Sequence, residues 1–223
     1  MTAQELYYDF HLLLNKNNED KEINIEAPNF VKLYNREAER WLADYIENNN
    51  KSDKIFELDF FLIPDVELER IDSRIQQDIY RMPKDCFSII EGDFRSEVES
   101  EGCKKTIFNE VAKTQEVNSL LSNKFTAPSF AWERGLAKVT KEGITVYKNN
   151  FEIDKTLISY YIRPKKIDLK GYVDSDNNLS EDKDPNYSDY IAQQILDRVV
   201  TEVHRQFENS AGFQLSKERQ RSF

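Results

Sequence analysis

The residues best suited to chemistry are the carboxylates of an acidic segment, residues 169–184, whose spacing approaches that of a calcium-binding loop. The run DSDNN, which begins at Asp174, opens like an EF-hand loop. The sixth position is then Leu179 where such a loop needs glycine, and the twelfth is Pro185 where it needs glutamate. A solvated acidic loop and a weak calcium site are therefore both open. The candidate ligands of a metal site are Asp174, Asp176, Asp182 and Asp184.

Histidine is the commonest general acid or base in enzymes, and the chain has two, His11 and His204. Neither has a cysteine or a second histidine at a spacing typical of a catalytic pair, so we interpret both as packing or surface residues. The sequence also lacks a Gly-x-Ser-x-Gly turn, a phosphate-binding loop, a dinucleotide-binding glycine motif and a His-Glu-x-x-His motif. We therefore predict no catalytic residues, no cofactor and no enzyme activity.

The chain is acidic, with 31 Lys and Arg against 41 Asp and Glu and a net charge of -10. Because binding to phosphates needs a positive field, this balance argues against a protein whose whole surface grips nucleic acid. An acidic wall can still surround DNA without holding it. Aromatic residues make up 12% of the chain, which predicts a folded protein, since disordered chains are poor in them.

Cys86 and Cys103 are the only two cysteines, too few for a disulfide framework, and we expect both to be reduced in a reducing compartment. No basic stretch followed by an apolar run opens the sequence, so no secretory signal is predicted. The longest apolar cluster, near Phe60, is far shorter than the roughly 20 residues that cross a membrane. We expect a soluble protein with no membrane partner.

Three segments have apolar residues at helical spacing and are predicted to be helices. They cover residues 6–14, residues 28–46 and residues 185–207, and the last two open with a proline, which suits the first turn of a helix. Residues 54–63 slightly favour a strand, while residues 66–80 fit a helix and a strand equally well.

The texture of the sequence changes from residue 82 to residue 162. Short runs rich in β-branched and aromatic residues alternate with turn residues such as Gly102 and Gly143. This pattern predicts a small antiparallel sheet or sandwich, with one helical insert over residues 115–121.

These elements predict an α+β fold in which the N- and C-terminal helices pack together as a helical bundle beside a central antiparallel β-rich sheet or sandwich. We assign residues 1–81 and 185–208 to the helical part, residues 82–168 to the β-rich part and residues 169–184 to the acidic loop.

Residues 209–223 are interpreted as a C-terminal arm, with Gly212 ending the preceding helix. A set of apolar and basic residues alternates with other residues along it. A frayed terminus and a docking arm are both open. The residues expected to bind a partner are Phe213, Leu215, Lys217, Arg219, Arg221 and Phe223.

Several segments within residues 5–210 together resemble one family. They are Leu33-Tyr-Asn35-Arg-Glu-Ala38-Glu-Arg-Trp41, Ala127-Pro-Ser-Phe, Gly143-Ile-Thr-Val-Tyr147, Tyr160-Tyr-Ile-Arg163-Pro164, Ile167-Asp168 and Asp184-Pro185 with the helix after it. The chain is similar in these segments to the head-to-tail connector (ring or adaptor) proteins of crAss-like tailed bacteriophages.

The resemblance implies a structural protein of the virion, without an active site. It implies a subunit of a homo-oligomeric ring, a dodecamer, in the neck between head and tail. Such a ring docks on the portal, a neighbouring ring or adjacent neck and tail proteins, and lines a channel through which DNA passes without specific binding. The protein would be assembled in the host cytoplasm, and its terminal arm would engage the portal. The alternatives are a non-catalytic soluble interaction or regulatory protein, and a carboxylate-based metal-dependent hydrolase.

Overall fold

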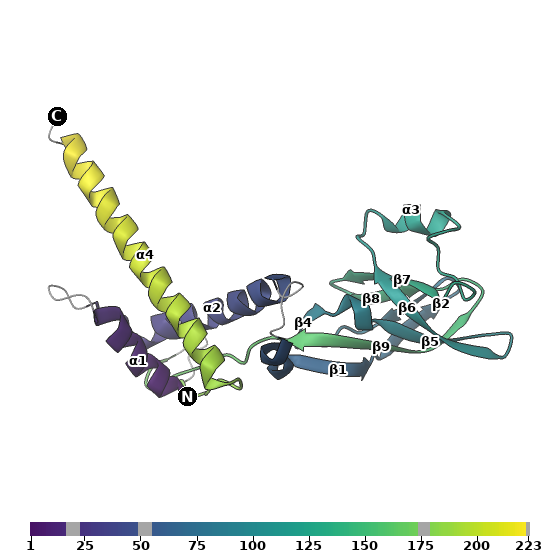
Figure 1. Cartoon of the computed structure of the whole chain (residues 1–223), viewed down its shortest axis with the longest axis horizontal. Helices are drawn as coiled ribbons and strands as arrows, with labels where there is room; N and C mark the ends of the chain where they lie inside the picture. Colours follow the sequence, from purple (N-terminus) through teal and green to yellow (C-terminus); the bar gives the residue numbers. More distant parts are fainter. Residues whose placement is uncertain (17–22, 49–54, 174–178, 222–223) are drawn as a thin grey trace. The chain divides into compact units, whose positions relative to one another are not determined.

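The structure is a computed structural model that describes residues 1–16, 23–48, 55–173 and 179–221 (Figure 1). For residues 48, 55–57, 91 and 208–221 it describes the backbone alone. The chain divides into two compact units, which we name the helical unit, Met1–Phe60 with Pro164–Phe223, and the sheet unit, Phe61–Arg163. The sheet unit is therefore inserted, in sequence, between the two halves of the helical unit.

The helical unit is built from α1 (Ala3–Asn15), α2 (Ala27–Asn48) and α4 (Asp189–Arg221), with the short 3-10 helix η2 (Ile55–Phe60) after α2. A capping box begins α1: the Thr2 side chain accepts a hydrogen bond from the backbone N–H of Glu5, and the Glu5 carboxylate accepts one from Thr2. Buried residues then recur four apart along α1, as the helical period requires: Leu6, Phe10 and Leu14.

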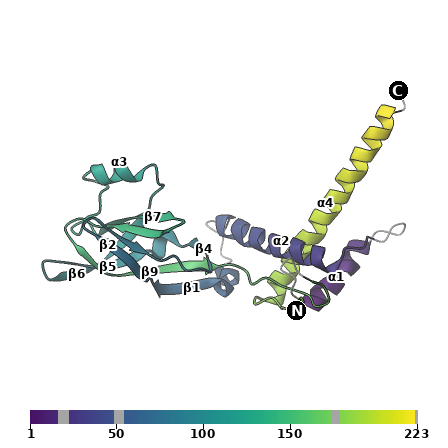
Figure 2. The same cartoon turned by 180° about the vertical axis from the view of Figure 1, so that it is seen from behind.

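The first half of α4 packs against α1 and α2, as Figures 1 and 2 show. Trp41 of α2 donates a hydrogen bond from Nε1 to Oε1 of Gln194 in α4, at 2.9 Å. The apolar face of α4 is buried at Ile191, Ile195, Leu196, Val199 and Val203. The prediction that the terminal helices pack together is confirmed.

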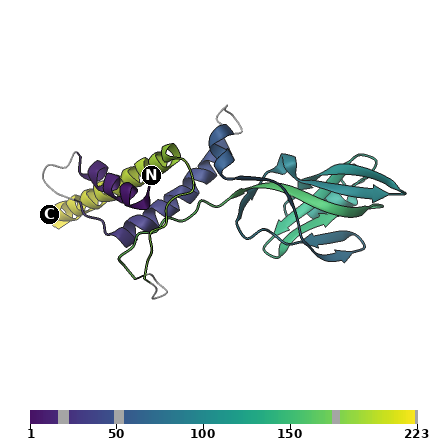
Figure 3. The ribbon, with the colours of Figure 1, turned by 90° about the horizontal axis from the view of Figure 1, so that it is seen from below.

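The sheet unit is one curled, mostly antiparallel sheet that forms a half-barrel (Figure 3). Its order is β1-β9-β5-β6-β7-β8-β3-β2, with β4 also paired to β9, and only β6 and β7 run parallel to each other. The strands are β1 (Leu62–Glu67), β2 (Arg70–Arg74), β3 (Gln77–Tyr80), β4 (Cys86–Ile89), β5 (Arg95–Ser100), β6 (Cys103–Val111), β7 (Arg134–Thr140), β8 (Gly143–Tyr147) and β9 (Glu152–Ile162). The α+β class is confirmed, and of the two β arrangements predicted, the structure has the single sheet, with one parallel pair.

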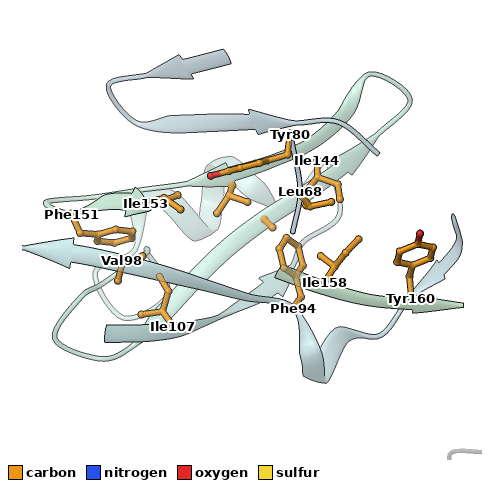
Figure 4. Packing of buried hydrophobic residues seen from close by; sticks show 12 residues of the cluster. Leu68, Tyr80, Phe94, Val98, Ile107, Ile144, Phe151, Ile153, Ile158 and Tyr160 are labelled. Atoms are coloured by element: carbon orange, nitrogen blue, oxygen red, sulfur yellow. The ribbon is translucent and has the colours of Figure 1, made fainter. Parts of the chain in front are cut away.

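The inner face of the curled sheet holds the apolar core of this unit (Figure 4). Alternate residues of each strand point into it, among them Val98 on β5, Ile107 on β6 and Ile158 on β9. The opposite face is partly covered by α3 (Val117–Ser122), which packs Val117 against Leu136 and Tyr147. This short helix lies where the helical insert was predicted.

Two local predictions in residues 55–80 differ from the structure. Residues 55–60 form η2 instead of a strand, and the sheet begins at Leu62, so the expected boundary at residue 82 falls inside the sheet unit. In residues 66–80, where a helix was one of the two alternatives, the helical spacing of the isoleucines does not mark a buried face. Ile71 is 51% and Ile75 is 95% exposed. Burial follows the two-residue period of a strand instead, so that alternate residues of β3, Asp78 and Tyr80, are buried.

The end of α4 also differs from the prediction. Its backbone stays helical through Gly212 as far as Arg221, so residues 209–221 of the segment assigned to a separate arm continue the helix. A glycine inside a helix costs only about 1 kcal/mol relative to alanine, which a long helix can absorb.

Candidate functional site

The acidic segment uses its described carboxylates in hydrogen bonds within the helical unit. Asp184 Oδ1 accepts a hydrogen bond from the backbone N–H of Ala3, at 2.8 Å, which ties the segment to the start of α1. Asp182 accepts hydrogen bonds from the Gln4 amide and from the backbone N–H of Lys170. The other two candidate ligands, Asp174 and Asp176, lie outside the described residues. Across the described ranges, no group of three or more His, Cys, Asp or Glu side chains is placed to hold a metal ion.

The two histidines lie on helices of the helical unit, where we expected packing or surface residues. The His11 ring lies edge-on to Tyr7, with ring centroids 4.7 Å apart, and to Phe10, at 5.4 Å. Edge-to-face contacts of this kind are one of the geometries that packed aromatic rings favour. His204 is half-buried on α4.

A buried cluster of charges ties together β2, β3 and the turn between β8 and β9, and nothing in the local sequence pointed to it. Asp78 is fully buried, and its Oδ1 accepts a hydrogen bond from Ser73 Oγ at 2.7 Å and lies 3.1 Å from Lys148 Nζ. The ammonium group of Lys148 also donates to Glu152, at 2.7 Å, while Arg70 Nε approaches the second oxygen of Asp78 at 3.6 Å. The two positive and two negative groups balance one another, although the second oxygen of Asp78 accepts no hydrogen bond among the described residues; we interpret the cluster as structural.

The charge of Lys148 is held by this cluster. Burial lowers the pKa of Lys148, but its hydrogen bonds to Glu152 and Asp78 outweigh burial, so the pKa lies above its ordinary value of 10.5. A lysine that acts as a general base needs a pKa that is lowered toward neutral pH, which is the opposite change. The arrangement therefore favours a fixed ion pair over proton transfer.

The connection between α3 and β7 carries two large aromatic side chains on its surface, Phe125 and Trp132, which we name the aromatic projection. They are 87% and 82% exposed, respectively. The connection around them is fixed by hydrogen bonds: Arg134 donates to the carbonyl oxygen of Phe125 at 2.8 Å, and Ser129 and Arg134 exchange two backbone hydrogen bonds. Glu133, next to Trp132, has φ of 50°, a conformation that non-glycine residues adopt rarely.

An apolar groove of about 270 Å³ opens at one end of the inner face of the sheet. It lies where β4 meets the ends of β6 and β7. Its apolar lining consists of Met82, Cys86, Phe87, Ile89, Val111 and Val139, with Ser88 as the one hydroxyl group.

The thiol in this groove is a poor nucleophile. Burial and the neighbouring carboxylate of Asp85 raise the pKa of Cys86 to about 11, so little thiolate exists near neutral pH. Cys86 on β4 and Cys103 on β6 are both free thiols, as expected. The groove is therefore better suited to packing an apolar side chain than to thiol chemistry.

The residues assigned to a docking arm lie on the last turns of α4, except Phe223, which lies outside the described residues. Of the others the structure describes only the backbone positions: Phe213, Leu215, Lys217, Arg219 and Arg221. The last buried residue of α4 is Val203, among the side chains that are described, and in Figure 2 the helix continues well past α1 and α2.

The fold and surfaces define an α+β protein with a discontinuous helical unit, an inserted half-barrel sheet and exposed aromatic and apolar features of the kind found at interfaces. No protein-family model matches the chain, and the comparison with curated proteins finds no relative. Among the described helices, none combines the length and apolar character needed to cross a membrane.

Proposed function

We propose that this protein is a structural subunit of a virion: one copy of a head-to-tail connector ring in the neck of a tailed bacteriophage. In this proposal it docks on the portal or a neighbouring ring and lines the DNA channel. The observation that carries the proposal is the series of segments, within residues 5–210, that resembles the connector proteins of crAss-like phages.

The segments that carry the resemblance also contribute contacts to the fold, because residues far apart in the series contact one another. Asn35 of α2 donates a hydrogen bond from Nδ2 to the carbonyl oxygen of Ile167, at 3.0 Å, and accepts one from the Ile167 N–H, at 2.9 Å. An asparagine that satisfies both backbone groups of a distant residue fixes the path of the chain there. Trp41 and Asp184 of the same series make the contacts to Gln194 and Ala3 described above. Residues of the series thus position the helical unit.

The distribution of charge supports a channel wall that DNA passes without being held. Residues 61–163 carry 15 Lys and Arg against 17 Asp and Glu, while the rest of the chain carries 16 against 24. The acidic excess is therefore concentrated in the helical unit. Like charge prevents the counterion release that drives binding to phosphates.

The proposal is tested on purified particles. Mass spectrometry of virions is expected to find the protein in a fixed ratio to the portal protein, corresponding to one ring per portal. Its absence from particles, with the protein present in infected cells as a monomer or dimer, would instead indicate a regulatory binding protein.

The docking role of the arm is tested by deleting residues 209–223. We expect weaker binding to purified portal, with the helical unit still folded, because the described buried face of α4 ends at Val203. Circular dichroism checks folding, and native mass spectrometry measures complexes with portal. A truncated protein that binds portal as well as the full chain would remove the arm from the proposal.

A further inference from the structure

We propose that the aromatic projection of one copy of this chain inserts into the apolar groove of the next copy. The inference deepens the proposed function and rests on it, since it assigns the contact by which subunits of the ring would associate. The two surfaces lie at different places on the sheet unit: the projection precedes β7, and the groove lies where β7 ends.

The aromatic projection combines exposed side chains with a hydrogen-bonded backbone. Phe125 and Trp132 are more than 80% exposed, although their connection is well fixed by hydrogen bonds. Arg134 holds the start of the projection through the Phe125 carbonyl and is itself paired with Glu110, at 2.7 Å. At its other end, the N–H of Trp132 donates to Ser129 Oγ, at 3.3 Å. Rigid exposed aromatic side chains are typical anchors of interfaces, because little conformational entropy is lost when they bind.

The backbone beside Trp132 supports the same conclusion. Glu133 has a positive φ of 50°, and the turn is closed by a hydrogen bond from its N–H to the carbonyl oxygen of Phe130. Non-glycine residues in this region are strained, and such residues cluster at binding and catalytic sites. The indole of Trp132 lies beside this turn and is 82% exposed.

The apolar groove has the size and lining for one such side chain. Its volume of about 270 Å³ exceeds the roughly 150 Å³ of a cavity that holds a benzene molecule. Six of its seven lining residues are apolar or a thiol, and all of these except Phe87 pack against the core cluster of the sheet unit. An indole inserted here would extend an existing core.

The presence of both surfaces on one chain points to a second copy as the occupant. One inserted aromatic side chain buries about 150–250 Å², well below the about 800 Å² that each partner buries in a stable interface. One such contact is weak by itself. Each copy, however, offers one projection and one groove at different places. A contact between unlike surfaces is head-to-tail, so it repeats from copy to copy and can close into a ring, which adds one contact for every subunit.

The first experiment measures self-association of the full chain by sedimentation velocity over a range of concentrations. The double variant Phe125→Ala/Trp132→Ala is expected to weaken association roughly thirtyfold or more, the loss typical of interface anchors. Ser88→Arg, which places a long side chain in the groove, should do the same. The control is Ile75→Ala, an exposed apolar residue of the same unit outside both surfaces. Circular dichroism checks that each variant folds.

Mixing the two kinds of variant tests the head-to-tail geometry. The projection variant keeps its groove, and the groove variant keeps its projection, so the mixture should form dimers and stop there. Wild-type protein that stays monomeric at all concentrations, alone and with portal, contradicts both the inference and the proposed function. Wild-type rings that are unaffected by Phe125→Ala/Trp132→Ala overturn the inference alone.

A cross-link provides a second readout that does not depend on affinity. Ala131→Cys, beside the projection, is combined with Cys103→Ser, so that Cys86 of the groove is the remaining native thiol. Oxidation at alkaline pH, where part of Cys86 is thiolate, should produce a ladder of covalent oligomers on a non-reducing gel. Adding Cys86→Ser should remove every band above the symmetric dimer. Disulfides that join only two introduced thiols, with none to Cys86, would contradict the proposed register.

Discussion

Replacement of Lys148 by methionine is the most direct test of the buried charge cluster. The ammonium group of Lys148 lies between Asp78, which is fully buried, and Glu152, whose side chain is 75% exposed. Methionine fills a similar volume but removes the charge. Glu152 can turn to water at little cost, whereas Asp78 stays in the interior. We therefore expect the loss of stability to come from Asp78.

The magnitude follows from the geometry around that carboxylate. Lys148 Nζ lies 3.1 Å from Asp78 Oδ1, and a pair at this distance attracts by roughly 5 kcal/mol at an effective dielectric constant of about 20. Removing one partner of a buried pair costs about 3–5 kcal/mol. Arg70, at 3.6 Å, and the hydroxyl of Ser73 remain to compensate the charge. We expect Lys148→Met to lower the free energy of unfolding of the sheet unit by about 3 kcal/mol, at the low end of that range.

The assay is amide hydrogen exchange with denaturant, read by mass spectrometry, because it measures the sheet unit separately from the helical unit. The control is Lys155→Met. Lys155 pairs with Glu97 at 3.0 Å, but both side chains are about 40% exposed, so this pair should contribute about 0–1 kcal/mol. Adding Asp78→Asn to Lys148→Met should recover part of the loss, since no unpaired carboxylate then remains buried.

The pH dependence gives an independent check. Because the pKa of Lys148 is raised in the folded protein, its contribution is complete below the unfolded pKa, about 10.4, and is lost as the pH rises through the folded value. Wild type should therefore lose stability above pH 10.4 more steeply than Lys148→Met. A cost below about 1 kcal/mol, equal to that of the exposed control pair, would refute the reasoning.

Three further predictions concern the fold and its thiols. Gly143→Ala should destabilise the sheet unit by about 2–4 kcal/mol in the same exchange assay. Gly143 has φ of 141°, and a Cβ there would overlap the carbonyl oxygen of Tyr80. A variant as stable as wild type would contradict this prediction. Thr2→Ala should cost about 1 kcal/mol in urea unfolding, and Thr2→Ser should cost little, since serine preserves the capping box. Alkylation of Cys86 by iodoacetamide should lag behind that of exposed Cys103 and rise about tenfold per pH unit up to about pH 11; a plateau near pH 9 would rule out the raised pKa.

The helices were predictable because their signals are local. The apolar residues of α1 recur with the period of the helix and follow the cap at Thr2, so a short stretch of sequence contains the whole pattern. The strands of residues 62–80 were less predictable, since β2 is an edge strand whose Ile71 is exposed. For such a strand, apolar residues do not mark the buried face, and only its neighbour β3 fixes its conformation.

The functional surfaces were the least predictable part. Asp78 and Lys148 meet only because β3 pairs with β8, and nothing near either residue specifies that pairing. Phe125 and Trp132 look like ordinary core residues in the sequence, because exposure depends on the fold around a side chain and not on its type. Gly212 is a case in which a local signal is misleading. Glycine commonly follows the last residue of a helix, but here Gly212 lies inside the helix α4.

The discontinuous helical unit has a consequence for how the protein is made. During translation, α1 and α2 leave the ribosome before the sheet unit, whereas α4, which packs against both of them, is synthesised after it. The half-barrel, complete once β9 has emerged, can fold while the N-terminal helices still lack their partner. The nascent chain therefore passes through a stage in which α1 and α2 lack their contacts with α4, and a chain truncated before Asp189 lacks them permanently. Only chains that extend through the buried face of α4, as far as Val203, can complete the helical unit, so shorter copies are excluded from any assembly that requires it.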